Sequence, residues 1–200
     1  EGGNYLVSDP VMDTVTQIDP ESLIQARFAK GFPEPKGKMY YPLHVPEKVS
    51  LHKPIKEGID QACHFMLKVP IPLFGVKGIR FLAGRVKNYP EKVGDRKAVL
   101  YLGNIIRMQE EIGTGGAGFR FLYAAFLQEA AMLLQKEELS VLSQDLTKVG
   151  DIWRNFAFHA GRVCKSRAAD GVSYKELSEM LVQCSVEEEQ LFRRLSKVKL

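Results

Sequence analysis

Residues 113–134 read GTGGAGFRFLYAAFLQEAAMLL, a glycine-rich run followed directly by a strongly apolar segment. In the apolar segment, hydrophobic side chains recur at intervals of three and four residues, which places them on one face of an α-helix. These side chains are Phe119, Leu122, Tyr123, Phe126, Leu127, Ala130 and Leu134. The stretch therefore predicts an amphipathic helix that begins at a glycine loop and must bury one face against other helices.

The same spacing of apolar residues continues on both sides of this stretch. It predicts a helix that begins at Pro54 and ends before Pro70, and Ser173 with Glu176 forms the pattern of a capping box. Further helices are expected over about 76–87, 96–112, 139–167 and 174–198. The predicted fold class is therefore mainly α, a multi-helix bundle.

The first third of the chain has a different composition. Residues 5–18 are typical of two short strands, and Asp19 before Pro20 predicts a helix that ends at Gly31. Five prolines from Phe32 to Pro54, the last of them Pro54 itself, favour an extended connector, in which 45–49 could form an edge strand. We expect three parts: a β-containing segment over 1–31, a Pro-rich connector over 32–53, and a helical domain over 54–200.

Composition excludes several functional classes. The net charge of +4 is small and the basic residues are scattered, so nucleic acid is not an expected partner. No apolar run is long enough to span a bilayer, so no membrane association is expected either. Three cysteines without a CxxC motif favour buried thiols in a reducing compartment, which predicts a cytoplasmic protein with no metal site.

The glycine loop matches the G-x-G-x-x-G spacing of dinucleotide-binding turns, at Gly113, Gly115 and Gly118. Such a turn must follow a buried strand, whereas helix-type spacing and the charged residues of RMQEE precede this one, so no cofactor is expected. Two interpretations remain. The glycines form a hinge between two helices, or the loop is an anion site at a helix N-terminus.

In the anion-site interpretation, backbone N–H groups and side chains of one short segment bind the anion. Its residues are Gly113, Thr114, Gly115, Gly116 and, as a forked donor in the first helical turn, Arg120. Phosphate, sulfate or a carboxylate of the protein itself would satisfy such a site equally.

No complete catalytic group can be assembled from the motifs of the chain. Cys63 and His64 are neighbours, but adjacent residues on a helix diverge by about 100° and do not face each other. The sequence contains no G-x-S-x-G, H-E-x-x-H or P-loop motif.

The stretch EEIGTGGAGFRFLYAAFLQEAA, residues 110–131, resembles the signature of an all-helical domain of uncharacterised function. In butirosin-biosynthesis-type acyltransferases of secondary metabolism, that domain follows a papain-like N-terminal domain. YLVSDP, residues 5–10, is similar to the strand that ends such a catalytic domain. The resemblance implies that 1–31 is the C-terminal remnant of the catalytic α+β domain, and that Asp9 orients a catalytic His.

The resemblance also implies a reaction, in which a Cys thiolate takes an acyl group from an acyl carrier protein thioester and an amine accepts it. The nucleophilic Cys and its His are expected upstream of this sequence. Two alternatives stay open: a papain-like cysteine peptidase or amidase, and a non-catalytic helical binding module. A homo-oligomer is compatible with each of the three.

Overall fold

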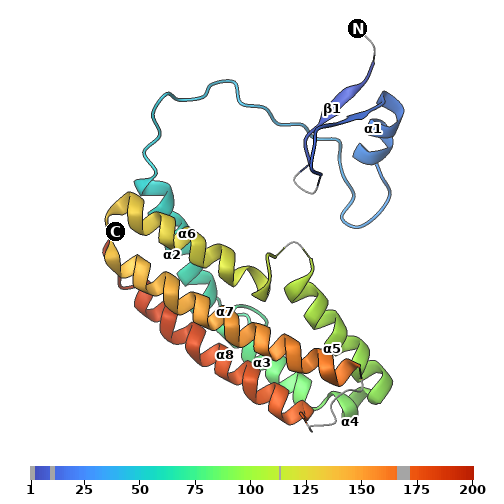
Figure 1. Cartoon of the computed structure of the whole chain (residues 1–200), viewed down its shortest axis with the longest axis vertical. Helices are drawn as coiled ribbons and strands as arrows, with labels where there is room; N and C mark the ends of the chain where they lie inside the picture. Colours follow the sequence, from blue (N-terminus) through green and yellow to red (C-terminus); the bar gives the residue numbers. More distant parts are fainter. Residues whose placement is uncertain (1–2, 10–11, 113, 166–171) are drawn as a thin grey trace. The chain divides into compact units, whose positions relative to one another are not determined.

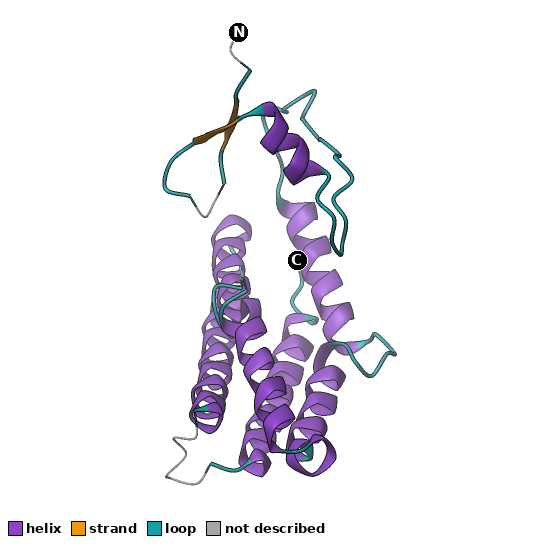
Figure 2. Ribbon diagram, turned by 90° about the vertical axis from the view of Figure 1, so that its right-hand side faces the viewer, coloured by secondary structure: helices purple, strands orange, loops and turns teal. Residues whose placement is uncertain are grey.

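The computed structural model is mainly helical, as the sequence predicts, and its described sheet is a short hairpin near the N-terminus (Figure 1, Figure 2). It describes residues 3–9, 12–112, 114–165 and 172–200. The chain divides into two units, 1–49 and 50–200. In the described ranges, no helix is both long enough and apolar enough to cross a membrane.

The unit 1–49 consists of a hairpin, one helix and an extended segment. Strands β1 (Tyr5–Val7) and β2 (Thr16–Ile18) are antiparallel, with Tyr5 opposite Ile18. Helix α1 (Pro20–Arg27) begins after Asp19, whose Oδ1 accepts a hydrogen bond from Ser22 N at 2.9 Å, which confirms the predicted N-cap. None of the described residues in this unit is buried. A two-stranded hairpin without a core is at best marginally stable on its own.

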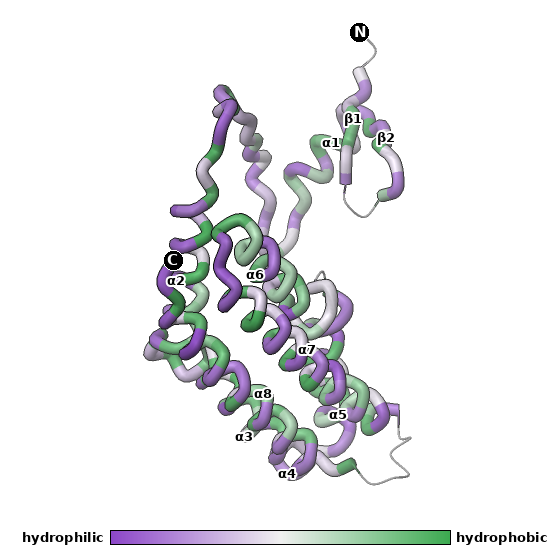
Figure 3. Tube along the Cα trace, turned by 60° about the vertical axis from the view of Figure 1, so that its left-hand side comes forward, coloured by the Kyte–Doolittle hydropathy of each residue, from purple (hydrophilic) through white to green (hydrophobic). Residues whose placement is uncertain are grey.

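The unit 50–200 is a bundle of helices whose hydrophobic residues, green in Figure 3, recur along each helix. Helix α7 packs against α5, α6 and α8, and α8 also packs against α2 and α3. The helices are α2 (His52–Leu67), α3 (Gly75–Lys87), α4 (Tyr89–Val93), α5 (Asp95–Glu110), the short 3-10 helix η1 (Ala117–Phe119), α6 (Arg120–Leu134), α7 (Glu137–Cys164) and α8 (Tyr174–Leu195).

One hydrophobic core lies between these helices. Its largest fully buried side chain is Phe156 of α7, and leucines supply most of the others. They are Leu102, Leu127, Leu139, Leu146, Leu177, Leu181 and Leu195. Burial of such side chains is the main favourable contribution to folding, at about 1.5–3 kcal/mol each. The core therefore fixes how α5, α6, α7 and α8 are placed around the glycine loop.

Local signals explain where several helices begin. Ser173 Oγ accepts from Glu176 N and Glu176 Oε2 accepts from Ser173 N, so the predicted capping box at α8 is confirmed. One prediction about local structure was wrong, and one short helix was not predicted. Residues 45–49 form no strand, because Pro46 lacks the backbone donor that an edge strand uses in pairing. The one-turn helix α4 was not predicted because five residues are too few to show helical spacing.

Gly150 of α7 permits a close contact with the ring of Phe121 on α6. A Cβ atom built at Gly150 would lie 2.6 Å from Phe121 Cε1. We expect Gly150→Ala to lower the free energy of unfolding by about 1–2 kcal/mol, because displacement of the ring outweighs the gain in helix propensity. Gly84→Ala on α3 is the matched control, since its Cβ meets nothing within 4 Å. Urea unfolding should show the control to be as stable as the parent or more so; equal losses in both variants would contradict the packing argument.

Candidate functional site

The loop between α5 and α6 has an unusual backbone. Five successive residues have positive φ: Gly115, Gly116, Ala117, Gly118 and Phe119. For alanine (φ 48°) and phenylalanine (φ 70°) this conformation is strained, and such strain persists only where the surrounding structure holds it. The loop is therefore held in one shape by its contacts. Gly113 lies outside the described residues.

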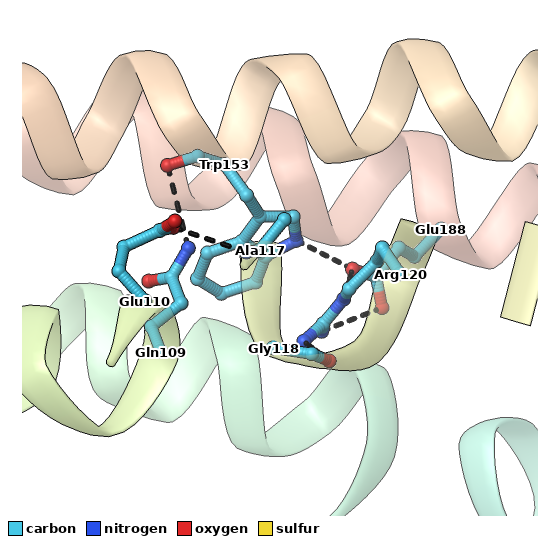
Figure 4. A network of polar contacts seen from close by, with 7 residues as sticks. All are labelled: Gln109, Glu110, Ala117, Gly118, Arg120, Trp153 and Glu188. Carbon is cyan, nitrogen blue, oxygen red and sulfur yellow. Dashed lines mark hydrogen bonds and ion pairs between the residues drawn. The ribbon is translucent and has the colours of Figure 1, made fainter. Parts of the chain in front are cut away.

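Thr114 and Glu110 supply two of those contacts. The buried Thr114 side chain donates from Oγ1 to Gln109 O at 2.6 Å and accepts from Gly116 N at 3.3 Å. Ala117 N donates to Glu110 Oε1 at 3.1 Å (Figure 4). The described part of the loop thus directs N–H groups at oxygens of the protein itself, one of which is a carboxylate. Binding of an external anion there stays a prediction.

Arg120, the first residue of α6, forms a forked ion pair with Glu188 of α8 (Figure 4). Its Nε lies 2.8 Å from Glu188 Oε1 and its Nη2 lies 3.2 Å from Oε2. Arg120 Nη1 also donates to Gly118 O at 3.0 Å, which joins the ion pair to the loop. The forked donor that the sequence assigned to an anion site therefore has a carboxylate partner within the protein.

Trp153 of α7 completes this cluster. Its indole Nε1 donates to Glu188 Oε1 at 2.6 Å, and its ring lies under the Arg120 guanidinium, with 4.5 Å between Arg120 Cζ and the ring centroid. Glu188 is 1% exposed, so these two partners take the place of the water that an exposed carboxylate would bind. We call Arg120, Trp153 and Glu188 the buried ion-pair cluster. It links α6, α7 and α8 at one point.

Glu188 was not predicted as a site residue, because an acidic residue on a helix is usually exposed. A signal for it exists, since Leu177, Leu181, Cys184, Glu188 and Leu191 continue one helical spacing and all five are buried. A charged residue at a core position indicates a buried partner of opposite charge.

Two apolar grooves lie next to the loop, and both are lined by Gly118, Phe119 and Arg120. The first, of about 230 Å³, is completed by Met66, Tyr123, Leu146, Glu188 and Phe192. The second, of about 390 Å³, is completed by Leu82, Ile105, Met108, Gln109, Thr114 and Trp153. We call them the Tyr123 groove and the Gln109 groove.

One residue that lines each groove carries a buried polar atom without a hydrogen-bond partner in the described part of the chain: Tyr123 Oη and Gln109 Oε1. Burial raises the pKa of Tyr123 well above its usual range, so its hydroxyl remains a neutral donor. Gln109 is 7% exposed, and its Nε2 donates to Trp153 O at 3.3 Å. Buried polar groups without partners are uncommon in folded proteins, and both of these occur at the grooves.

The cysteines are not suited to nucleophilic chemistry. Burial raises the pKa of Cys63 to about 11 and that of Cys184 to about 12, so neither is a thiolate at neutral pH. Cys164 is only half-buried, which corrects the prediction that all three thiols are buried, but desolvation raises its pKa as well. Asp9 lies in the unit 1–49, exposed, just after β1. Its role beside a catalytic His stays a prediction.

The buried thiols should make the folded protein less stable as pH rises through the alkaline range. Because the pKa values of Cys63 and Cys184 are raised from 9.0, the folded chain holds more protons than the unfolded chain above that pH. Their stabilising contribution is complete below pH 9.0 and is lost as pH rises through the folded values. In urea unfolding at several alkaline pH values, Cys184→Ala should show a weaker fall in stability with pH than the parent. Parallel pH curves would contradict this assignment.

Comparison with known proteins gives one match. The family model described as a domain of unknown function (DUF4872) matches residues 21–195. No curated protein and no solved structure matches the chain. Because the matched residues cover most of the chain and include the whole glycine loop and the buried ion-pair cluster, the chain belongs to the DUF4872 family.

Proposed function

We propose that residues 50–200 form the substrate-binding domain of a cysteine-dependent acyltransferase, which moves an acyl group from a carrier-protein thioester to an amine. The binding role rests on one observation, the two apolar grooves that are both lined by Gly118, Phe119 and Arg120. Ligand sites in proteins are typically concave and mostly apolar, with a few polar groups that fix orientation. The reaction rests on the resemblance of residues 110–131 and 5–10 to the butirosin-type enzymes.

In this proposal the helical unit binds substrate and leaves the covalent step to other residues. The raised pKa values of Cys63, Cys164 and Cys184 support that division. The thiolate is the nucleophile, and a thiol with a raised pKa remains protonated at neutral pH. A Cys thiolate of a papain-like domain would attack the thioester carbonyl and release the carrier thiol. The amine would then attack the acyl-enzyme, form the amide and release the Cys sulfur, with His transferring the proton and Asp9 orienting that His.

The experiment uses the full-length protein with an acyl carrier protein thioester and a set of amines, and detects the amide product by mass spectrometry. We expect amide formation that a thiol alkylator blocks. Asp9→Asn should lower the rate at least about tenfold, because an unoriented His is a poor base. Asp13→Asn, an exposed aspartate in the same hairpin, is the matched control and should leave the rate unchanged.

The other outcomes separate the alternatives. Alkylator-sensitive hydrolysis of peptides without transfer to any amine would replace the proposal with a cysteine peptidase. Ligand binding without either reaction would indicate a non-catalytic binding module, which the three protonated thiols also favour. Equal rates for Asp9→Asn and Asp13→Asn would remove Asp9 from the proposed site.

A further inference from the structure

We propose that the Gln109 groove binds a neutral molecule with an apolar body and one N–H or O–H donor, of the carboxamide or alcohol class, whose donor bonds Gln109 Oε1. This inference names the ligand chemistry of one groove and so rests on the binding role in the proposed function. It does not depend on the acyl-transfer reaction.

The first support is the amide oxygen of Gln109. Gln109 lines the groove, and its Oε1 is shielded from solvent and accepts no hydrogen bond from any described residue. The other end of the amide is fixed, because Nε2 donates to Trp153 O (Figure 4). A ligand donor that reaches Oε1 therefore gains a hydrogen bond without displacing one that the oxygen already makes to protein.

The second support is the neutral electrostatics of the groove. Among its lining residues the one formal charge is that of Arg120, and Glu188 neutralises it through a forked pair. Gln109 Oε1 would repel a carboxylate, since both are acceptors. An ammonium ion would lose its water without gaining an unpaired counter-charge, which is unfavourable in an apolar site. The groove therefore selects against both ions and accepts a neutral donor.

The third support is size and shape. A protein cavity of about 150 Å³ is enough for a benzene ring. The Gln109 groove has a volume of about 390 Å³, bounded by Leu82, Ile105 and the half-exposed ring of Phe119. It thus has room for a six-membered ring with a short polar substituent.

The test uses four molecules that share a cyclohexyl body: cyclohexanecarboxamide, its methyl ester analogue, cyclohexanecarboxylate and cyclohexylmethylamine. Trp153 is the one tryptophan of the sequence and lines the groove, so its fluorescence reports binding at this site. We expect the carboxamide to bind about tenfold more tightly than the methyl ester, which lacks a donor, and more tightly than either ion. Equal affinities for the amide and the ester, or no response to any of the four, would overturn the proposal.

Variants of the full chain locate the effect. Gln109→Met keeps the length of the side chain without its oxygen, and should abolish the preference for the amide over the ester. Gln128→Met, an exposed glutamine on α6, and Tyr123→Phe, in the other groove, are controls that should keep the preference. A preference that survives Gln109→Met would also overturn the proposal.

A second variant covers the case in which Gln109→Met does not fold, which circular dichroism will show. Ile105→Phe narrows the groove without altering Gln109, and should lower the affinity for all four molecules by a similar factor. Unchanged affinities in Ile105→Phe would place the binding elsewhere and contradict the proposal. Because these assays report binding and the amide assay reports turnover, failure of one leaves the result of the other intact.

Discussion

Glu188→Ala should lower the free energy of unfolding by about 3–5 kcal/mol. Glu188 is 1% exposed and accepts hydrogen bonds from Arg120 and Trp153. Its removal leaves the Arg120 guanidinium partly buried without a counter-charge and the indole N–H without an acceptor. Because domains are stable by only about 5–15 kcal/mol in total, this loss is a large fraction of the whole.

The neighbouring residue provides the control. Glu189 pairs with both Arg80 and Arg193, whose side chains are 44% and 63% exposed, so water screens both pairs. Glu189→Ala should therefore cost less than about 1 kcal/mol. The double variant Arg120→Met with Glu188→Leu removes both charges and should recover the part of the loss that comes from the unpaired guanidinium, as replacement of buried pairs by apolar residues often does. Similar losses for Glu188→Ala and Glu189→Ala in urea unfolding would show that the ion pair is not buried as described.

Gly116→Ala should lower the free energy of unfolding by about 2–4 kcal/mol. Gly116 has φ 86° and ψ 160°, a region that residues other than glycine almost never adopt. Its Cβ would also lie 3.0 Å from Arg154 Nη2 and 3.2 Å from Glu110 Oε2, so the substitution disturbs the carboxylate that accepts from Ala117 N. Backbone strain and crowding therefore act in the same direction.

Gly161→Ala is the control for this prediction, since Gly161 lies within helix α7 and its Cβ would meet nothing within 4 Å. Thermal unfolding of the two variants should differ clearly, with Gly161→Ala equal to the parent or more stable. If Gly116→Ala is as stable as the parent, the loop does not have the backbone described here.

The helices of the bundle could be predicted from sequence because burial imposes a spacing of three and four residues on each of them. The prediction for residues 76–87 agrees with α3 within one residue, and Ser173 marks the start of α8 because its capping contacts are local. Phe119 differs from this pattern. It has the spacing of a helical residue, yet it lies just before α6 with φ 70° and is 55% exposed.

The candidate site could be predicted only in part. The glycine loop was visible because backbone with positive φ favours glycine. Glu188, the partner of Arg120, lies 68 residues further along the chain. The spacing of residues within one helix carries no information about which other helix that helix contacts. The unpartnered oxygen of Gln109 was likewise invisible, since its environment is formed by α5 and α7 together.

The central claim is that the glycine loop and the buried ion-pair cluster build a ligand site between α5, α6 and α7. Amide and indole NMR shifts during titration of the full chain with cyclohexanecarboxamide test it most directly. We predict that the changes concentrate at Gln109, at 114–120 and at the indole N–H of Trp153, and that methyl cyclohexanecarboxylate gives the same changes only at higher concentration. Shifts confined to other helices, or none at saturating concentration, would contradict the claim.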